Sequence, residues 1–332
     1  MKWVYQLTVL LIALCLCEKD SFAGQPSFRQ TPEQFMKTAA HQWQELNRLH
    51  ALPFVEPAVG VPTYVPLAQL CRGQSEISVD NIYAKIKEHL KLNDLSFHHH
   101  SWTPNHDSGR SVVPRSDAIT VVKGPQGYVI VDGHHDVFLS LFVGAETIAV
   151  TVESDWSTLS PLNFWKTLKA RNLIYLPETA EQLVRHVPDM MNVKDNPNRY
   201  LVTLLALKVQ ADFEKGEWKI LKAKGSKNAV WVKLNNSIPF IEFYLSEVIG
   251  MNGIHYDPQW GTQVPSRVVE KIRYAFLHSE DSPHAELLKH TLILSQSESA
   301  ERLDQHSSRL SALLGSSLPH MGSPLCGAIF SN

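Results

Sequence analysis

The residues of this chain that could do chemistry gather in one short segment, Asp132-Gly133-His134-His135-Asp136. An imidazole near neutral pH can transfer a proton, donate a hydrogen bond to a phosphate oxygen or bind a metal ion. A carboxylate beside it, such as Asp132, can orient the ring. The segment therefore predicts catalytic roles for His134, His135 and Asp132. The alternative is that the two aspartates only cap a helix and that the histidines are exposed without a role.

The residues around this segment predict a strand that turns sharply into a helix. The β-branched residues 118–123 and the apolar residues 128–131 predict a hairpin, and the apolar residues 137–143 predict the helix. The first N–H groups of a helix have no partner within it, and together with the helix dipole they attract anions. We therefore expect a phosphate site at this helix end, with Gly133 and Asp136 among its residues.

The segment YVIVDGHH, residues 128–135, resembles the DGHH signature of ParB-like proteins in the ParB/sulfiredoxin superfamily. Further segments resemble those of its ParB-like nuclease group and follow in the same order. They are DWS, FWKTLKAR, VPD, DNPNRY and PFIEF, at residues 155–157, 164–171, 187–189, 195–200 and 239–243. Because several ordered segments agree, the resemblance covers roughly residues 60–260 and not the DGHH alone.

The resemblance implies an α/β chain whose ParB/sulfiredoxin-like core has a small mixed sheet and helices, and we expect a mainly helical C-terminal part after it. It implies a phosphate or nucleotide pocket at the strand–helix turn, with Arg72 and Gln74 in a second polar wall. For these two residues the alternative is an exposed loop. The chain lacks the Gly-Glu-Arg-Arg turn of CTP-binding ParB proteins and the cysteine of sulfiredoxins, so neither of those activities is expected.

Three functions fit these features. The first is an exported phosphoester hydrolase, a nuclease, in which N–H groups after Gly133 hold the phosphate. One histidine or a divalent metal ion then activates water, and the other histidine protonates the leaving oxygen. The second is a module that binds a nucleotide or another phosphorylated ligand without chemistry, and the third is an interaction protein that keeps only the fold.

A divalent metal ion is the cofactor that the first function could use, and nothing in the sequence identifies which ion. A second candidate metal site lies in a long polar loop that is rich in histidine. Its ligands would be His98, His100 and His106, which could bind a transition metal. The alternative is that these histidines belong to a mobile surface loop.

Composition and charge limit the partners. The chain has 332 residues, of which 44% are hydrophobic and 19% are charged, so it belongs with globular proteins and not with disordered or multi-span membrane proteins. Its 31 basic and 33 acidic residues give a net charge of −2, and no strong basic patch stands out. The expected partner is a phosphorylated ligand or a nucleic acid, and a nucleic acid would need a local patch.

The N-terminus has the layout of a secretory signal peptide. A basic residue precedes an apolar run at 4–17, and residues 21–23 carry the small side chains that a signal peptidase reads. The alternatives are a membrane anchor, although the run is shorter than the ~20 residues that a spanning helix needs, and a lipid anchor at Cys15 or Cys17. We expect cleavage after residue 23, export to the periplasm or the outside of the cell, and no membrane span in the mature chain.

Five parts follow one another along the chain. They are the signal peptide 1–23, an N-terminal helix and connector 24–58, the ParB/sulfiredoxin-like core 59–158, a family-specific α/β extension 159–262 and a helical C-terminal region 263–332. Helices in the last two parts are predicted at 198–209, 240–249, 268–277, 285–294 and 300–314. Cys71 and Cys326 remain after cleavage and could form a disulfide, or they could be unrelated thiols.

Overall fold

The computed structural model describes residues 29–48, 54–92, 95–98, 101–105, 110–212, 217–223, 231–235, 240–261, 263–278 and 292–294. The predicted signal peptide, the predicted helix at 300–314, His100, His106 and Cys326 lie outside these residues. The predictions that depend on them, including the Cys71–Cys326 disulfide, stay predictions. No helix of the described residues is both long enough and apolar enough to span a bilayer.

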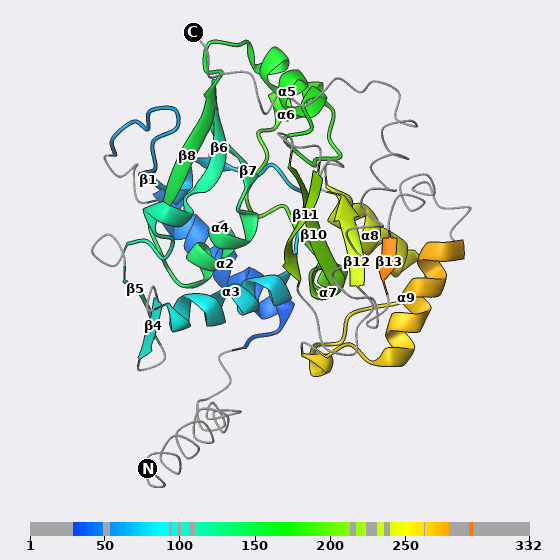
Figure 1. The fold of residues 1–332 in the computed structure, drawn as a ribbon. Coiled ribbons are helices and arrows are strands. Elements are labelled where there is room, and N and C mark those ends of the chain that lie inside the picture. Colours follow the sequence, from blue (N-terminus) through cyan, green and yellow to red (C-terminus); the bar gives the residue numbers. More distant parts are fainter. Residues whose placement is uncertain are drawn as a thin grey trace, which may run out of the picture.

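A five-stranded mixed sheet forms the centre of the fold (Figure 1). Its strands in spatial order are β1 (Thr63–Pro66), β8 (Thr147–Asp155), β6 (Ile119–Gly124), β7 (Gly127–Asp132) and β2 (Leu70–Cys71). β6 and β7 form the predicted antiparallel hairpin, whereas β6 pairs with β8, and β7 with β2, in parallel. The predicted small mixed sheet is thus confirmed.

One face of this sheet carries Val121 and Ile130, which are paired across the hairpin and are fully buried. The helices that cover this face are α2 (Pro32–Arg48), α3 (Val79–Lys91) and α4 (His134–Phe142). Phe35 of α2 stacks on Phe142 of α4 with ring centroids 4.6 Å apart. Because these side chains lose their contact with water, the three helices and the sheet form one hydrophobic core.

The opposite face carries the paired residues Val122 and Val129. It is covered by two helices, α5 (Pro161–Ala170) and α6 (Ala180–Arg185). Gly124 makes room for this layer, because a Cβ atom there would lie 2.4 Å from the Phe164 ring. The alternation of inward and outward side chains along β6 therefore produces two cores from one strand.

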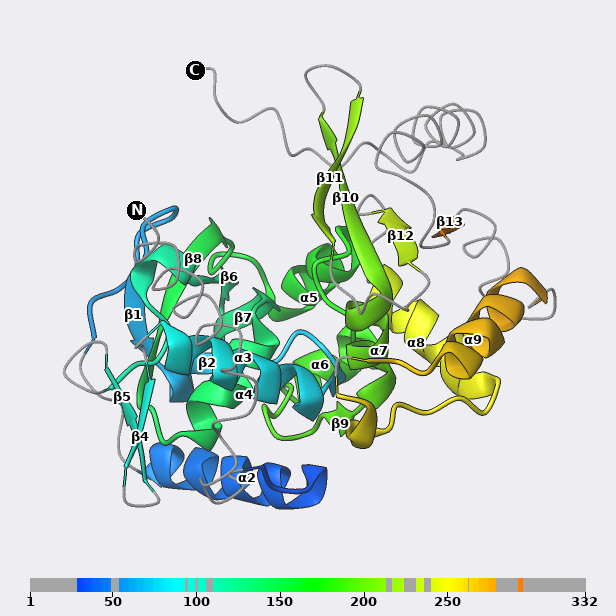
Figure 2. The same cartoon turned by 60° about the horizontal axis from the view of Figure 1, so that its bottom comes forward.

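A second group of helices and strands lies beside the central sheet (Figure 2). Its helices, α7 (Pro197–Leu205), α8 (Ile241–Met251) and α9 (Ser266–His278), pack around a core of their own. Its sheet has the order β11 (Glu217–Ala223), β10 (Ala206–Asp212), β12 (Trp231–Asn235) and β13 (Leu292–Leu294). The helices predicted at 240–249 and 268–277 are confirmed by α8 and α9.

Two helix predictions in this part need correction. The helix predicted at 198–209 ends at Leu205, and the chain continues as strand β10. The helix predicted at 285–294 does not hold for its last three residues, which form β13. A short apolar run fits either a helix or a strand, and pairing with distant strands decides between them. β10 pairs with both β11 and β12, and β13 pairs with β12.

The remaining elements of the described residues are two short strand pairs and three single 3-10 turns. β3 (Glu76–Ile77) and β9 (Lys194–Asp195) form a short parallel pair. β4 (Leu95–His98) and β5 (Ser101–Pro104) form a hairpin within the segment that was predicted to be a long polar loop, so this part of it is not a loop. Single 3-10 turns lie at Leu67–Gln69, Arg115–Asp117 and Pro258–Trp260.

Candidate functional site at the β7–α4 turn

The turn between β7 and α4 requires glycine at its centre. Gly133 has a φ of 95°, and a Cβ atom there would lie 2.4 Å from Cγ2 of Ile119. Its N–H donates to Oδ1 of the exposed Asp132 over 2.8 Å. Because α4 begins directly after this glycine, the first main-chain N–H groups of the helix are placed at the mouth of the turn. The predicted strand–turn–helix is confirmed.

His134 is a buried acceptor of a main-chain hydrogen bond. Its side chain is 2% exposed, and its Nε2 accepts the N–H of Gly73 over 2.9 Å. Burial, and then the charges of Arg199 and Arg72, lower the pKa of His134 to about 3. A neutral imidazole whose Nε2 accepts must carry its proton on Nδ1. This Nδ1 is buried and has no hydrogen-bond partner among the described residues.

His135 makes the equivalent bond one residue later. Its Nε2 accepts the N–H of Ser78, the N-cap of α3, over 3.1 Å. Burial, followed by the charges of Arg199 and Lys85, holds the pKa of His135 well below its usual value. The two imidazoles therefore attach the segment 73–78 to the start of α4, and both are neutral at physiological pH.

Asp136 pairs with a lysine of the neighbouring helix. Its carboxylate lies 2.7 Å from Nζ of Lys85 on α3. Burial raises the pKa of Asp136, and the Lys85 charge opposes that rise. Its carboxylate thus has a partner within the protein, across the interface between α3 and α4.

Arg72 and Gln74 are buried, so the alternative of an exposed loop is not observed. Arg72 is 2% exposed and Gln74 is 8% exposed. The Arg72 guanidinium donates to the carbonyl oxygen of Asp189 over 3.0 Å and pairs with Glu178 at 2.8 Å. These bonds hold the segments just before and just after α6 against the end of β2. Gln74 extends the contact through a parallel β-bridge to Tyr175.

Arg199 is a buried cation whose charge contributes to the lowered pKa values of both histidines. Its Nη1 donates to the carbonyl oxygen of Glu76 over 2.7 Å, and its Nη2 lies 3.7 Å from a carboxylate oxygen of Glu242. The guanidinium carbon sits 3.8 Å from the centre of the Phe243 ring. These contacts give the buried charge a cation–π contact and a carboxylate partner.

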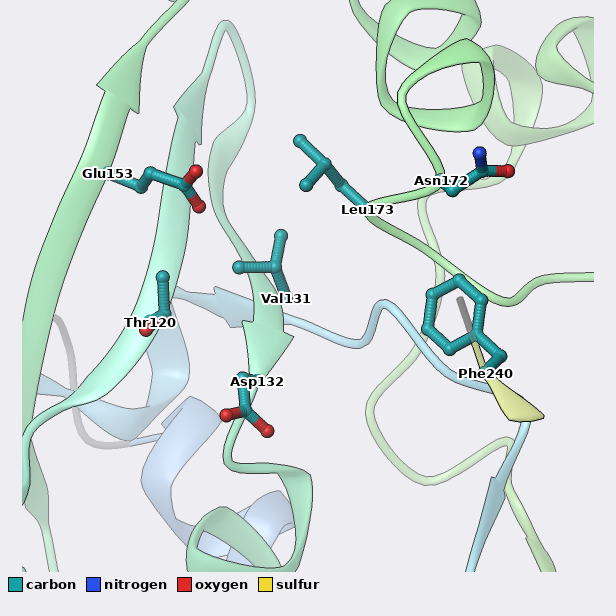
Figure 3. Close-up of a pocket in the computed structure, with 7 residues that line it drawn as sticks. All are labelled: Thr120, Val131, Asp132, Glu153, Asn172, Leu173 and Phe240. Atoms are coloured by element: carbon teal, nitrogen blue, oxygen red, sulfur yellow. The ribbon is translucent and has the colours of Figure 1, made fainter. Parts of the chain in front are cut away.

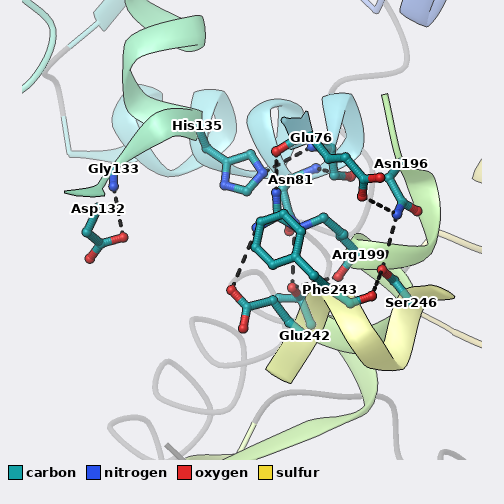
Figure 4. A network of polar contacts seen from close by, with 12 residues as sticks. Glu76, Asn81, Asp132, Gly133, His135, Asn196, Arg199, Glu242, Phe243 and Ser246 are labelled. Atoms are coloured by element: carbon teal, nitrogen blue, oxygen red, sulfur yellow. Dashed lines mark hydrogen bonds and ion pairs between the residues drawn. The ribbon is translucent and has the colours of Figure 1, made fainter. Parts of the chain in front are cut away.

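The segment DNPNRY connects the core to the second group of elements (Figure 4). Asp195 Oδ1 accepts the N–H of Val79 over 2.9 Å at the start of α3. Asn196 donates to Glu76 over 2.8 Å and to Ser246 on α8 over 3.1 Å. The motif segments that contain His135, Asn196 and Phe243, which are far apart in the sequence, therefore meet in one polar network.

A pocket of about 300 Å³ opens beside this network (Figure 3). The sheet contributes one side, and the end of α5 and the start of α8 contribute the other. Its lining residues are Thr120, Val131, Asp132, Glu153, Asn172, Leu173 and Phe240. Both ionisable residues of this lining are carboxylates. The pocket therefore disfavours an anion, whereas the N-terminus of α4 attracts one.

Oxygen ligands for a divalent metal ion are available at the same place. Asp132 and Glu153 both line the pocket, and carboxylate oxygens are the ligands that Mg²⁺ and Mn²⁺ prefer. Groups of three or more potential metal ligands do not occur among the described residues. The main chain of His98 belongs to β4, while His100 and His106 lie outside the described residues, so the metal role of these three histidines stays a prediction.

Five features of the site were not singled out from the sequence. Arg199, Phe240 and Phe243 lie in segments that carry the family resemblance, and this was the signal that could have found them. Glu153 had no signal beyond its place in a predicted strand. The span 206–235 contains seven lysines and three acidic residues, a local excess that the charge of the whole chain conceals.

The chain is a mixed α/β protein, and a family model shows to which class it belongs. The family model described as "Putative ParB-like nuclease" matches residues 63–249, more than half of the chain. The chain belongs to this ParB-like nuclease family. The predicted family is confirmed, and all the segments that carried the resemblance lie within the matched residues.

The comparisons with solved structures and with curated proteins add little to the family assignment. The crystal structure of protein Atu1540 from Agrobacterium tumefaciens is similar, with 18% sequence identity and a TM-score of 0.40. The match covers 66% of this chain and 93% of that chain. No curated protein matches this chain.

Proposed function

We propose that this chain is an exported phosphoester hydrolase, a nuclease, whose substrate phosphate binds at the N-terminus of α4. The observation that carries the proposal is the geometry of the turn. Gly133, in a left-handed conformation, presents the start of a nine-residue helix at the edge of a pocket that holds an exposed carboxylate. Main-chain N–H groups and the helix dipole then attract the phosphate. The buried cation Arg199 adds positive charge nearby.

The chemistry requires a base that can reach water. Asp132 fits this role, because its carboxylate is exposed and lines the pocket. The base takes a proton from water as the water oxygen attacks phosphorus. The bond from phosphorus to the ester oxygen then breaks, that oxygen takes a proton from solvent water, and Asp132 afterwards returns its own proton to solvent. A divalent metal ion bound beside Asp132 would neutralise charge on the phosphate and acidify the water.

The sequence predicted catalytic roles for the two histidines, and this proposal gives them a different role. A general acid or base needs a free ring nitrogen and a pKa near neutrality. In both His134 and His135, Nε2 is occupied by a main-chain N–H and the pKa lies below its usual value. We therefore assign them as positioning residues, which hold segment 73–78 and the helix end in place.

Two features favour nucleic acid as the substrate. β10 and β11 form a ribbon that extends away from the central sheet (Figure 2), and the span 206–235 that includes it has a net charge of +4. Such a local excess of lysine attracts a phosphate backbone. The predicted signal peptide at 1–23 supports export, and outside the cytoplasm polymeric nucleic acid is a more available phosphoester than a nucleoside triphosphate.

A second candidate function is supported by the same histidines. Because both imidazoles are fixed as neutral acceptors, the turn could bind a phosphorylated ligand without turning it over. This binding module would need the helix end, Gly133 and Arg199, and it would not need the Asp132 carboxylate as a base.

One experiment separates these functions. The chain from Gly24 to Asn332 is incubated with single-stranded DNA, plasmid and RNA, with Mg²⁺, Mn²⁺ or Zn²⁺ or with a chelator. We expect metal-dependent cleavage that falls about 100-fold or more in Asp132→Asn, a loss typical of a missing general base. The amide oxygen of the substituted side chain would still accept the Gly133 N–H, so the turn itself is kept.

The matched variant is His135→Gln. Its amide oxygen can accept the Ser78 N–H, but the side chain cannot exchange a proton near neutral pH. Cleavage that persists in this variant supports the positioning role, and cleavage that disappears from a folded variant returns His135 to the catalytic role. Absence of cleavage under every condition would overturn the hydrolase, and equal cleavage by Asp132→Asn would overturn the assignment of Asp132 as its base. Binding without turnover would then favour the module.

A further inference from the structure

One wall of the pocket beside the turn is aromatic. The backbone conformation that places this aromatic ring is an unfavourable one. Phe240 has a φ of 59°, a left-handed conformation in which a bulky side chain is unusual. Its ring is packed against Tyr175 and Phe243, with centroid distances of 5.4 and 5.8 Å. A glycine at this position would relieve the backbone strain. We therefore attribute the presence of phenylalanine here to its aromatic ring.

The opposite side of the pocket is acidic. Figure 3 shows the Glu153 carboxylate directed into the pocket from β8, and the Phe240 ring across the pocket from Thr120 and Asp132. Val131 and Leu173 form the apolar surface between them. Since no cationic side chain of the described residues lines the pocket, an anionic phosphate is disfavoured there. The pocket instead suits a flat, uncharged group that carries N–H donors on its edge.

We propose that this pocket binds an unpaired nucleobase, guanine in preference to the others. The base stacks on Phe240 and donates hydrogen bonds to the Glu153 carboxylate. The inference rests on the proposed function, because the phosphate of the same nucleotide binds at the helix end beside Asp132. The volume of about 300 Å³ lies at the small end of ligand pockets, where a single base fits.

The preference for guanine follows from its donor pattern. A carboxylate has two acceptor oxygens, and guanine presents two adjacent donors, its N1–H and its exocyclic amine. Cytosine, adenine and uracil each place an acceptor beside their donor, and that acceptor would face the carboxylate. Because these guanine donors form the Watson–Crick edge, the base must be unpaired, and the substrate is single-stranded nucleic acid.

The test measures binding without turnover. The chain from Gly24 to Asn332 is titrated calorimetrically with GMP, AMP, CMP, UMP and ribose 5-phosphate, in the presence of a chelator. We expect GMP to bind most tightly and ribose 5-phosphate, which has no base, most weakly. Phe240→Leu should weaken GMP about 10-fold, the loss typical of one stacked base, and leave ribose 5-phosphate unchanged. Glu153→Gln should reduce the preference for GMP over AMP about 10-fold.

Two further variants complete the design. Phe240→Tyr keeps a stacking surface and should bind GMP like the wild type. Tyr274→Leu changes an exposed aromatic residue of α9, which does not line the pocket, to leucine and should change nothing. If Phe240→Leu does not fold, as judged by circular dichroism, Glu153→Gln and Phe240→Tyr decide the matter. A wild type that binds GMP no better than ribose 5-phosphate, or a folded Phe240→Leu or Glu153→Gln with unchanged affinities, would overturn the proposal.

These outcomes are distinct from failure of the hydrolase. A wild type that prefers GMP but cleaves nothing keeps the base pocket and removes the catalytic proposal. A wild type that cleaves single strands and duplexes equally and shows no base preference keeps the hydrolase and removes the base pocket.

Discussion

The bond from Gly73 to His134 should make the stability of the protein depend on pH in a way that one substitution removes. An imidazole in the unfolded chain titrates near a pKa of about 6.5. In the folded protein the pKa of His134 is about 3, because the ring is buried beside two arginines. Below pH 6.5 the unfolded state therefore binds a proton that the folded state does not, and the free energy of unfolding falls as pH falls.

The size of the effect follows from the two pKa values. The full difference corresponds to about 5 kcal/mol between pH 6.5 and 3, at about 1.4 kcal/mol for each pKa unit. Between pH 7 and pH 5 the contribution of His134 comes to about 2 kcal/mol. His135 acts in the same direction. Burial raises the pKa values of Asp136, Asp80 and Asp195, so these groups act in the opposite direction, and the wild type alone cannot isolate His134.

The assay is urea unfolding of the wild type and His134→Gln at pH 7, 6 and 5. The amide oxygen of the substituted side chain can accept the Gly73 N–H, but the amide does not titrate. Because the other groups are common to both proteins, we expect the wild type to lose about 2 kcal/mol more than the variant between pH 7 and 5. His41→Gln, at an exposed position of α2, is the control and should follow the wild type. Parallel pH profiles for the wild type and His134→Gln would refute the buried neutral acceptor.

Three further predictions concern the turn, the network and export. In denaturant melts, Gly133→Ala should destabilise the protein more than Gly144→Ala. Both glycines have a positive φ, which costs an alanine about 1–2 kcal/mol at either position, but of these two sites only Gly133 has a neighbour that the new methyl group would clash with. Equal losses of stability would contradict the clash. Arg199→Met should cost about 3 kcal/mol, because it leaves acceptors in the network without their donor, and Arg199→Lys should recover only part of that cost; a Met variant as stable as the wild type would show that the network is dispensable. The chain expressed with its full N-terminus in a bacterial host should be recovered from the periplasm or medium with Gly24 as its first residue by N-terminal sequencing, and retention of Met1 would contradict the signal peptide.

The local elements at the site could be predicted from the sequence. The β-branched residues of β6 and β7 and the glycine-containing turn between them specify a hairpin through contacts between near neighbours. Ser78 and Ser160 cap α3 and α5, and Thr31 and Gln34 form the reciprocal bonds of a capping box at 3.1 and 3.3 Å. Such signals act over three or four residues, so they survive without knowledge of the rest of the fold.

Other parts of the structure depend on partners that are remote in sequence. Residues 206–209 continue a helical pattern, yet they form a strand because β11 and β12 supply pairing partners. The position of Glu76 next to Arg199 joins residues 123 apart in the sequence. Neither pairing leaves a periodic signal near the residues concerned, which is why sequence patterns missed the second sheet and the role of Arg199.

The sequence by itself determined that Asp132, Gly133, His134 and His135 stand where a strand turns into a helix, because glycine and the flanking apolar periodicity act locally. Only the tertiary structure decided what these residues contact. It directs Nε2 of His134 and of His135 to main-chain N–H groups 61 and 57 residues away, and it leaves Asp132 exposed at a pocket with Glu153 and Phe240. The residue types set the chemistry that is available, whereas burial and long-range packing set which atoms remain free to use it.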